Sequence, residues 1–363
     1  MNSSIEIYQA SKLGEAHWTA WRQFHLANPE LDSPYFHPQF VRGLIEAGYE
    51  VVVAVTESAT GIDALFPFER NGAQGRPAGW PMNDFQGVIA MPGTRFDLLA
   101  FMRTAGLKAF LFDHLVQTQA AFTPHIETVR SSPFMEIQGG LDAYKGRLAD
   151  TGKRALTDTL RRVRKAEREL GPLRLELQSA DSALLQTAIE WKQRQYRETG
   201  ADNFLGQPRP RAFMEWLFRQ RENPEFCGAL TALWAGDKLI ALHIGMRARR
   251  VLHWWFPSYD PAFENYSPGR LMLAKLVEAA EPLGLDRIDL GKGDSFYKQQ
   301  VMTGSTVVCE GYIETRPALR ALRRHQRALV AAVRASPTFL KLRELKHRML
   351  APPPKKLKPE KPE

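Results

Sequence analysis

Runs of β-branched and aromatic residues in the first half of the chain alternate with turn residues in a pattern typical of strands. Tyr49–Thr56 and Ala64–Glu69 predict two strands joined by a tight turn at Thr60-Gly61. After a Gly- and Pro-rich section, Phe96–Thr104 has helical spacing, and Ala109–Leu115 is apolar enough for a buried strand. The first half is therefore predicted to hold a strand hairpin, an irregular section, a helix and a strand, in that order.

The second half repeats this order after a basic helix that is predicted over Asp158–Leu170 and stopped by Gly171-Pro172. Three strands are expected in succession, followed by a helix and a short strand. Their ranges are Gly228–Trp234, Leu239–Arg247, Val251–Pro257, Leu271–Ala280 and Arg287–Leu290, with a last strand at Thr306–Ile313. The shared order favours a tandem duplication, although two α/β units can also resemble each other by chance.

Charge is distributed unevenly along the 363 residues, which carry 49 Lys+Arg against 40 Asp+Glu and a formal net charge of +9. The last 48 residues, 316–363, hold 14 basic and 3 acidic side chains, so the rest of the chain is close to neutral. The excess charge therefore belongs to the tail and does not indicate a nucleic-acid-binding body. A second basic cluster lies on the helix predicted over Asp158–Leu170.

Composition limits the class of protein further. Cys227 and Cys309 are the only cysteines, which excludes a disulfide scaffold and a Cys-based zinc cluster, and we expect no metal site. No stretch approaches the roughly 20 apolar residues of a membrane span, and the N-terminus lacks a basic region followed by an apolar core. We therefore expect a cytoplasmic protein.

The segment Tyr266-Ser267-Pro268-Gly269-Arg270 precedes the helix predicted over Leu271–Ala280. A helix N-terminus concentrates unpaired N–H groups and positive dipole, which suit a phosphate. Gly269 lets the backbone approach a ligand and Arg270 adds a charge. The alternative is a helix start that binds nothing, with Ser267 as its N-cap.

These motifs together resemble a known family. The region from about residue 45 to 315 resembles GNAT acetyltransferases of the CelD-like and BioF2-like subgroup, linked to cellulose and exopolysaccharide synthesis and related to the FemAB aminoacyl transferases. The segments that carry the resemblance are Leu65–Phe68, Asn83–Gly87, Leu160–Glu169, Tyr259–Pro261, Tyr266–Arg270, Asp289–Gly291, Gly293-Asp294 and Tyr297-Lys298.

The resemblance implies an α/β (α+β) fold of two tandem GNAT-like halves, with mixed, mostly antiparallel sheets flanked by helices and a basic helical tail. The expected domains are 1–150, 151–315 and 316–363. It also implies that the second half binds acyl-CoA, with acetyl-CoA as the expected form, through Ser267, Gly269 and Arg270. The usual GNAT phosphate loop has more glycine, whereas here Pro268 precedes the single Gly269, so the alternative donor of the FemAB relatives, aminoacyl-tRNA, stays open.

Acyl transfer to an amine needs a deprotonated amine, a stabilised oxyanion and a protonated leaving group. We expect Asp289 and Asp294 to orient or deprotonate the amine, unless Asp289 is a capping carboxylate and Asp294 a turn residue. Tyr297 would protonate the thiolate and Lys298 would stabilise the oxyanion or hold a phosphate. The alternative for Tyr297 and Lys298 is a surface pair on an edge strand.

The acceptor is expected between the two halves. Asn83, Asp84 and Gln86 form a polar cluster among glycines, whose alternative is turn chemistry. Trp255 would contribute an aromatic wall for a sugar or acyl group, or else pack in the core. His243 and His253 lie on adjacent predicted strands, where buried partners in the sheet are favoured over general bases.

The predicted function is an N-acyltransferase that moves an acyl group from acyl-CoA to an amine of a sugar or a small envelope-related acceptor. Two alternatives are an aminoacyl-tRNA-dependent transferase and a non-catalytic accessory protein of polysaccharide export. Nucleic acid other than tRNA is not expected as a partner. The amphipathic basic stretch 316–350 predicts peripheral contact with the inner face of a membrane, unless it packs on the domain.

Overall fold

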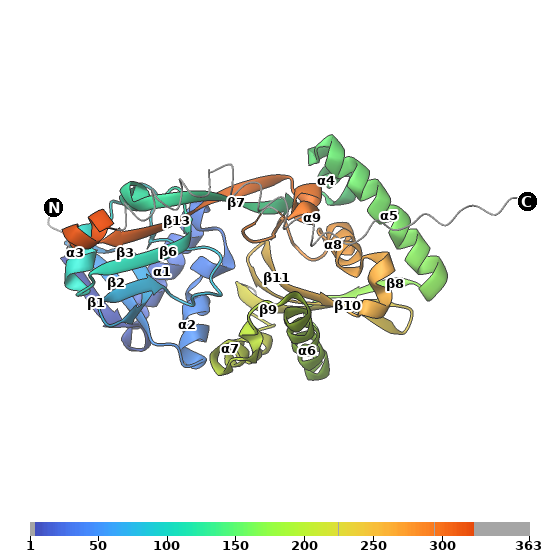
Figure 1. Cartoon of the computed structure of the whole chain (residues 1–363), viewed down its shortest axis with the longest axis horizontal. Coiled ribbons are helices and arrows are strands. Elements are labelled where there is room, and N and C mark those ends of the chain that lie inside the picture. Colours follow the sequence, from blue (N-terminus) through green and yellow to red (C-terminus); the bar gives the residue numbers. More distant parts are fainter. Residues whose placement is uncertain (1–3, 224, 294, 323–363) are drawn as a thin grey trace, which may run out of the picture. The chain divides into compact units, whose positions relative to one another are not determined.

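A computed structural model describes residues 4–223, 225–293 and 295–322 of the chain. Within them, thirteen strands form one mixed sheet, in the order β1-β2-β3-β4-β6-β13-β7-β12-β11-β10-β9-β8, with β5 paired to β3 (Figure 1). The strands are β1 (Ser4–Gln9), β2 (Val51–Ser58), β3 (Gly61–Asn71), β4 (Gln74–Pro77), β5 (Ile89–Ala90), β6 (Ala109–Val116), β7 (Ile126–Glu136), β8 (Leu173–Glu176), β9 (Phe226–Ala235), β10 (Lys238–Ala248), β11 (Val251–Tyr259), β12 (Arg287–Asp289) and β13 (Gly304–Glu314).

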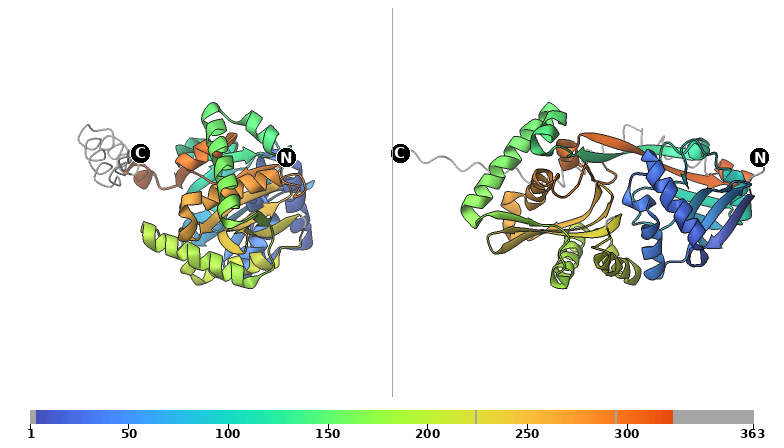
Figure 2. Two further views of the ribbon diagram at one scale, coloured as in Figure 1. Left: turned by 90° about the vertical axis from the view of Figure 1, so that its right-hand side faces the viewer. Right: turned by 180° about the vertical axis from the view of Figure 1, so that it is seen from behind.

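Helices cover both faces of this sheet. In the C-terminal half, α6 and α7 lie on one face and α5 and α8 on the other (Figure 2). The helices are α1 (Glu15–Ala27), α2 (Pro38–Glu46), α3 (Leu98–Thr104), α4 (Gly140–Arg147), α5 (Asp150–Leu170), α6 (Ser182–Thr199), α7 (Pro208–Arg219), α8 (Pro268–Glu278) and α9 (Phe296–Val301). Short 3-10 turns connect several of them, including η6 (Pro261–Tyr266) before α8.

Each half contains the hairpin that its sequence predicts. Strands β2 and β3 pair antiparallel, and so do β9 and β10, whose turn contains Gly236 at φ +55°. A short parallel pair follows in each half, β4 with β6 and β11 with β12. The predicted α/β (α+β) fold, with a mixed and mostly antiparallel sheet flanked by helices, is confirmed.

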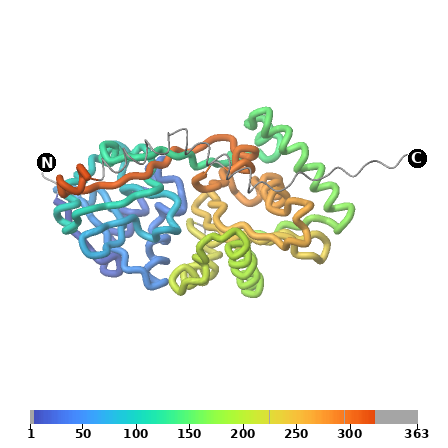
Figure 3. The backbone as a smooth tube through the Cα atoms, in the orientation of Figure 1, coloured from blue at the N-terminus to red at the C-terminus, as the bar shows by residue number. Residues whose placement is uncertain are grey.

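Strands β7 and β13 run between the two halves. Strand β7 pairs with β12 of the C-terminal half at one end, and with β13 along most of its length. Strand β13 lies between β6 and β7, although it comes 188 residues after β6 in the chain. Figure 3 shows the two strands side by side, β13 in orange-red and β7 in teal. The sheet is therefore continuous across the two halves.

The parallel pair of the C-terminal half is very short, and this creates an opening in the sheet. Strand β11 pairs with β12 only from Val251 to His253, where β12 ends at Asp289. Strand β11 then continues to Tyr259 while staying paired with β10 on its other edge. The two parallel strands therefore separate after His253, and a gap forms beside the second half of β11.

The local predictions differ from the structure in several places. Helices α2 and α4 and strands β1, β4 and β5 have no counterpart in the predicted elements. Tyr297 and Lys298 lie on helix α9, so the alternative of an edge strand is wrong. The tail beyond residue 322, with its predicted amphipathic helices, lies outside the described residues. None of the described helices is long and apolar enough to cross a membrane.

Candidate active site

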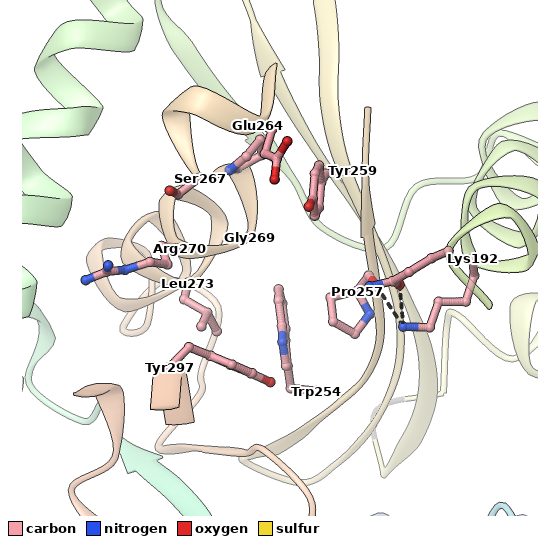
Figure 4. A pocket seen from close by; sticks show the side chains of 12 residues that line it. Lys192, Trp254, Pro257, Tyr259, Glu264, Ser267, Gly269, Arg270, Leu273 and Tyr297 are labelled. Atoms are coloured by element: carbon pink, nitrogen blue, oxygen red, sulfur yellow. Dashed lines mark hydrogen bonds between the residues drawn. The ribbon is translucent and has the colours of Figure 1, made fainter. Parts of the chain in front are cut away.

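A cavity of about 550 Å³ lies beside the separated part of β11, and we name it the α8 cavity. Its walls come from the end of η6, the first turn of α8, helix α6 and helix α9 (Figure 4). The lining includes Lys192, Trp254, Tyr259, Ser267, Gly269, Arg270 and Tyr297. The cavity thus occupies the place where the sheet opens, next to a helix N-terminus.

The first turn of α8 leaves its backbone accessible. Ser267 has a left-handed conformation (φ +59°, ψ +61°), and its side chain makes no capping hydrogen bond. Gly269 has neither a positive φ nor a close neighbour, since a Cβ added there would meet no atom within 4 Å. Neither backbone conformation nor packing therefore requires a glycine at this position, whereas the close approach of a ligand would.

Two arginines lie around this helix start, but their guanidinium groups are engaged by protein oxygens. Arg162 of α5 donates to the carbonyl of Asn265 (3.0 Å) and to Oγ of Ser267 (3.4 Å). Arg270 donates to the carbonyl of Ala155 in α5 (2.8 Å), and its guanidinium points away from the cavity (Figure 4). Burial lowers the pKa of Arg270 from its ordinary value. Arg270 therefore fixes α8 to α5 in this structure.

Tyr297 and Lys298 follow each other on α9 and face different surroundings. The phenol of Tyr297 extends into the α8 cavity toward Trp254 (Figure 4), and burial raises its pKa to about 12, so it stays protonated at neutral pH. The ammonium of Lys298 donates to the carbonyls of Gly291 (2.9 Å) and Lys292 (3.0 Å). Lys298 therefore fixes the loop after β12. The predicted Asp294 lies outside the described residues.

Asp289 ends strand β12 and does not line the α8 cavity. Its carboxylate is 1% exposed and lies 3.0 Å from Nε of Arg287. Because neighbouring side chains in a strand alternate, and Ile288 packs in the core with α8, Asp289 points to the opposite face. Burial raises the pKa of Asp289, with the Arg287 charge opposing it. The structure thus places Asp289 apart from Tyr297.

A second and larger cavity, of about 830 Å³, lies between the two halves, and we name it the Asp84 cavity. Its walls come from both halves and include several aromatic side chains, with two carboxylates and two arginines as charged groups. The lining includes Tyr49, Arg76, Trp80, Asp84, Asp202, Arg209, Trp255 and Phe256. Trp254 lines the α8 cavity, and its neighbour Trp255 lines the Asp84 cavity, so strand β11 contributes to both.

Asn83 and Gln86, predicted to bind the acceptor beside Asp84, are buried and hydrogen-bonded within the protein. Asn83 donates to the carbonyl of Ala78 (3.0 Å) and accepts from the amide of Phe85 (3.0 Å). Gln86 donates to Oδ1 of Asp113 (2.6 Å) and accepts from the amides of Asp113 and His114, each at 3.1 Å. These bonds hold the loop against β6 and so position Asp84.

Asp84 joins the two halves through a pair of histidines. Its Oδ2 lies 3.0 Å from Nε2 of His253 on β11, and its Oδ1 lies 3.5 Å from Nε2 of His114 on β6. Burial by itself would raise the pKa of Asp84. The hydrogen bond with His253 and the charges of His253, His114 and Lys298 outweigh burial and lower that pKa below its usual value. Asp84 therefore stays ionised at neutral pH.

His243, the other candidate histidine, has a structural role. His243 is fully buried, stacks on Trp254 with ring centroids 4.1 Å apart, and accepts from the amide of Trp255 (3.1 Å). This bond satisfies the amide at a bulge in β11, where Trp254 and Trp255 lie opposite the single residue Gly245 of β10. Burial lowers the pKa of His243 to about 3, so the ring is neutral.

Lys192 was not among the predicted site residues, although it lines the α8 cavity. Its ammonium donates to Oε1 of Gln195 (2.9 Å) and to the carbonyl of Pro257 (3.2 Å), and burial lowers its pKa to about 8. Its helix is amphipathic, and lysine is common on the exposed face of such a helix, so the sequence offered no signal. The described residues contain no group of three or more His, Cys, Asp or Glu side chains able to hold a metal.

The C-terminal half matches a known domain family. Residues 153–299 match the acetyltransferase (GNAT) domain family, a span that includes the α8 cavity and His253. No curated protein matches the sequence. The resemblance to GNAT proteins is thus supported for this region, without resolving the CelD-like and BioF2-like subgroup.

Solved structures share the fold over most of the chain. The structure named FemX has 9% sequence identity and a TM-score of 0.57, covering 88% of this chain and 99% of its own. The C-terminal domain of a protein named as a lysylphosphatidylglycerol synthetase from Agrobacterium fabrum has 12% identity, a TM-score of 0.52 and coverages of 88% and 97%. A tandem GNAT protein from the clavulanic acid biosynthesis pathway has 8% identity, a TM-score of 0.52 and coverages of 87% and 99%.

At these identities the structural likeness establishes the fold, which is that of a tandem, GNAT-like protein. The chain is an acyltransferase enzyme that contains an acetyltransferase (GNAT) domain over residues 153–299.

Proposed function

We propose that this enzyme transfers an acyl group, acetyl in the simplest case, from acyl-CoA to an amine. The observation that carries the proposal is Gly269, whose open backbone lies at the first turn of α8 beside the α8 cavity. A helix N-terminus favours phosphate, and the cavity between β11 and α8 has room for the arm of a thioester. Ser267 and Gly269 would contact the donor, while Arg270 would act by holding α8 in place.

The acceptor amine would enter through the Asp84 cavity. Because β11 contributes side chains to both cavities, an amine at Asp84 and a thioester at Tyr297 would meet where β11 and β12 separate. The aromatic side chains Trp80, Trp255 and Phe256 suit stacking on a sugar ring. We therefore propose an amino sugar or a small, ring-containing envelope precursor as acceptor, as the CelD-like and BioF2-like resemblance implies.

The chemistry needs one base and one acid. In the proposed reaction the amine nitrogen bonds to the acyl carbon, the carbon–sulfur bond breaks, and the nitrogen loses a proton to Asp84. Tyr297, which its raised pKa keeps protonated, donates its phenolic proton to the leaving thiolate and regains a proton from solvent. Asp289 would support the opening in the sheet through Arg287, and Lys298 would hold the loop beside Asp84.

Donor binding and turnover test this proposal separately. Acetyl-CoA at millimolar concentration should raise the melting temperature, because a ligand that binds only the folded state stabilises it. Thiol release in the presence of a panel of amino sugars should then identify acceptors. No thermal shift with CoA, acetyl-CoA or longer acyl-CoA, combined with no thiol release, would overturn the proposal and favour a non-catalytic accessory role.

A second donor, aminoacyl-tRNA, is favoured by one observation. Helix α5 presents exposed basic side chains along one face beside the start of α8, at Arg154, Arg161, Arg164, Lys165 and Arg168. Such a stripe could follow a phosphate backbone. Filter binding of tRNA that weakens steeply with salt, and that Arg161→Gln combined with Arg164→Gln reduces, would support this donor over acyl-CoA.

We also propose that the enzyme works at the cytoplasmic side of the membrane, with contact through 316–350. Support comes from the 14 basic and 3 acidic side chains of residues 316–363. Deletion of 316–363 should abolish sedimentation with anionic vesicles and leave thiol release unchanged. Unchanged sedimentation would contradict this part of the proposal.

A further inference from the structure

Four titratable side chains form a line that starts at the acceptor side of the proposed site. His253 of the C-terminal half lies 3.0 Å from Asp84, Asp84 lies 3.5 Å from His114, and Nδ1 of His114 lies 3.2 Å from Oδ1 of Asp113. Imidazole and carboxylate alternate along the whole line. Only His253 comes from the C-terminal half, and the other three residues come from the N-terminal half.

The end of the line at Asp113 is held in place by neighbouring groups. Its Oδ1 accepts from Nε2 of Gln86 (2.6 Å) and its Oδ2 from Nε1 of Trp80 (3.2 Å). Burial would raise the pKa of Asp113, but the hydrogen bond and charge of His114 outweigh it and lower that pKa. Lys292 donates to the main-chain carbonyl of Asp113 (2.9 Å). These contacts hold the carboxylate of Asp113 beside Nδ1 of His114.

Exposure of the side chains gives the line a direction. The His253 side chain is 0% exposed, that of His114 is 10% exposed, and those of Asp84 and Asp113 are 23% and 28% exposed. Asp84 lines the Asp84 cavity, so an acceptor bound there would cover it. With the acceptor in place, the way from Asp84 to solvent leads through His114 and Asp113, while the way through His253 ends in the interior. A histidine between two carboxylates can take a proton on one ring nitrogen and release one from the other.

We propose that His114 and Asp113 relay the proton of the acceptor amine from Asp84 to solvent, an inference that rests on the proposed function. As the new carbon–nitrogen bond forms, the nitrogen gives its proton to Asp84. Asp84 passes a proton to Nε2 of His114, which releases its Nδ1 proton toward Asp113 and solvent, and the ring then returns to its first tautomer. Asp84 is thus ready for the next turnover, and His114 is a positioning and relay residue that touches no substrate.

Other ionisable groups surround the relay, and their charges also affect its pH dependence. Lys298 of α9 adds to the lowering of the pKa of Asp84. Burial, and after it the charge of Asp84, raises the pKa of Tyr35, whose ring lies against His253. Lys292 lowers the pKa of Asp113 and also pairs with Glu310 of β13 at 2.9 Å. The charges around the line thus favour ionised carboxylates on either side of His114.

The test is His114→Gln, assayed by thiol release with acetyl-CoA and an amine acceptor that the wild-type enzyme uses. We expect kcat to fall about tenfold or more with the KM of both substrates nearly unchanged, because proton removal and not binding is impaired. The remaining rate should rise with imidazole or buffer concentration at fixed pH and ionic strength, because an added base replaces the relay. Asp113→Asn should give the same buffer dependence.

Two controls separate the relay from other causes. His17→Gln changes a histidine of the N-terminal half that lies 3.9 Å from Glu57 and outside the line, and it should leave kcat and buffer dependence unchanged. A His114→Gln enzyme with wild-type kcat, or with a reduced kcat that buffer does not restore, overturns the relay. An Asp84→Asn enzyme with full activity overturns instead the assignment of Asp84 in the proposed function. If His114→Gln does not fold, the buffer response of Asp113→Asn decides the question.

Discussion

The two halves of the molecule share one order of elements, but they differ at the place where a short parallel strand pair ends. In the N-terminal half, β4 and β6 pair only at two positions, and the chain from residue 78 to 90 then fills the space beside β6. In the C-terminal half, β11 and β12 separate after His253 and leave the α8 cavity. One half therefore closes its opening with its own chain, while the other leaves room for a ligand.

The helix that follows each opening shows the same contrast. Asp97 is the N-cap of helix α3. Its side chain accepts from the amide of Ala100 (2.8 Å), so a carboxylate occupies the N-terminus of this helix. Ser267 is the N-cap of helix α8 and makes no such bond, and Gly269 is the second residue of this helix. A carboxylate at a helix N-terminus repels phosphate. The open helix start therefore lies in the C-terminal half, where donor binding is proposed. The N-terminal half, in which residues 78–90 fill the space beside β6, supplies Asp84.

The largest effect is expected from a carboxylate introduced at the open helix. Gly269→Glu places a negative charge where the donor phosphates are proposed, so the KM for acetyl-CoA should rise at least about tenfold, which is roughly 1.4 kcal/mol. Leu99→Glu is the matched change, because Leu99 is the second residue of α3 and is 54% exposed. Thiol-release kinetics should separate the two variants. Equal KM values would remove the proposed difference between the halves.

A smaller effect on turnover is expected from Gly291→Ala. A Cβ at Gly291 would lie 2.9 Å from Oδ2 of Asp84, and the residue has φ +73°, so the substitution displaces Asp84 and strains the backbone. We expect kcat to fall about tenfold and the free energy of unfolding to fall by about 1–2 kcal/mol. Gly106→Ala has a similar φ of +65° with no neighbour within 4 Å, and should affect stability alone.

Acid stability should involve both halves through one buried histidine each. Burial lowers the pKa of His37 and of His243 to about 3, against 6.5 in the unfolded chain. Between these values the unfolded chain binds protons that the folded protein does not, so stability falls as pH falls from 6.5 toward 3. Each histidine contributes up to about 1.4 kcal/mol per pH unit. Measured from pH 7 to 4, the melting temperature should depend less on pH in His37→Gln and in His243→Gln than in the wild-type protein. An unchanged pH dependence in both variants would contradict this origin.

The smallest effect concerns the two helix starts directly. Asp97→Ala should lower the free energy of unfolding by about 1 kcal/mol, because it removes a capping hydrogen bond from α3. Ser267→Ala should leave stability nearly unchanged, because its hydroxyl caps no amide of α8. Chemical denaturation measures both. A larger loss in Ser267→Ala than in Asp97→Ala would contradict the comparison.

Sequence patterns predicted the features that depend on neighbouring residues. Alternation of apolar residues identified β9, β10 and β11, and a helix start with Pro268 and Gly269 identified the edge of the α8 cavity. The polar cluster that contains Asp84 was predicted to lie between the halves, where the Asp84 cavity is found. These predictions needed only local periodicity and turn chemistry.

The remaining features depend on contacts between distant segments. Asp84 and His253 are 169 residues apart, and no spacing in the sequence indicates that their side chains meet. The orientation of Asp289 depends on which face of a three-residue strand packs against α8, and the motif alone leaves both faces open. The place of β13 beside β7 likewise depends on long-range pairing, whose register the sequence does not indicate.

That last strand has a consequence for the order in which the protein can fold during synthesis. Strand β13 fills the position between β6 and β7, yet it leaves the ribosome after the entire C-terminal half. Until then β6 and β7 each have an unpaired edge, and such edges invite pairing with other chains. A nascent chain that stops before residue 304 therefore lacks a sheet strand in the half that was made first, and the two halves mature together once the end of the chain is released.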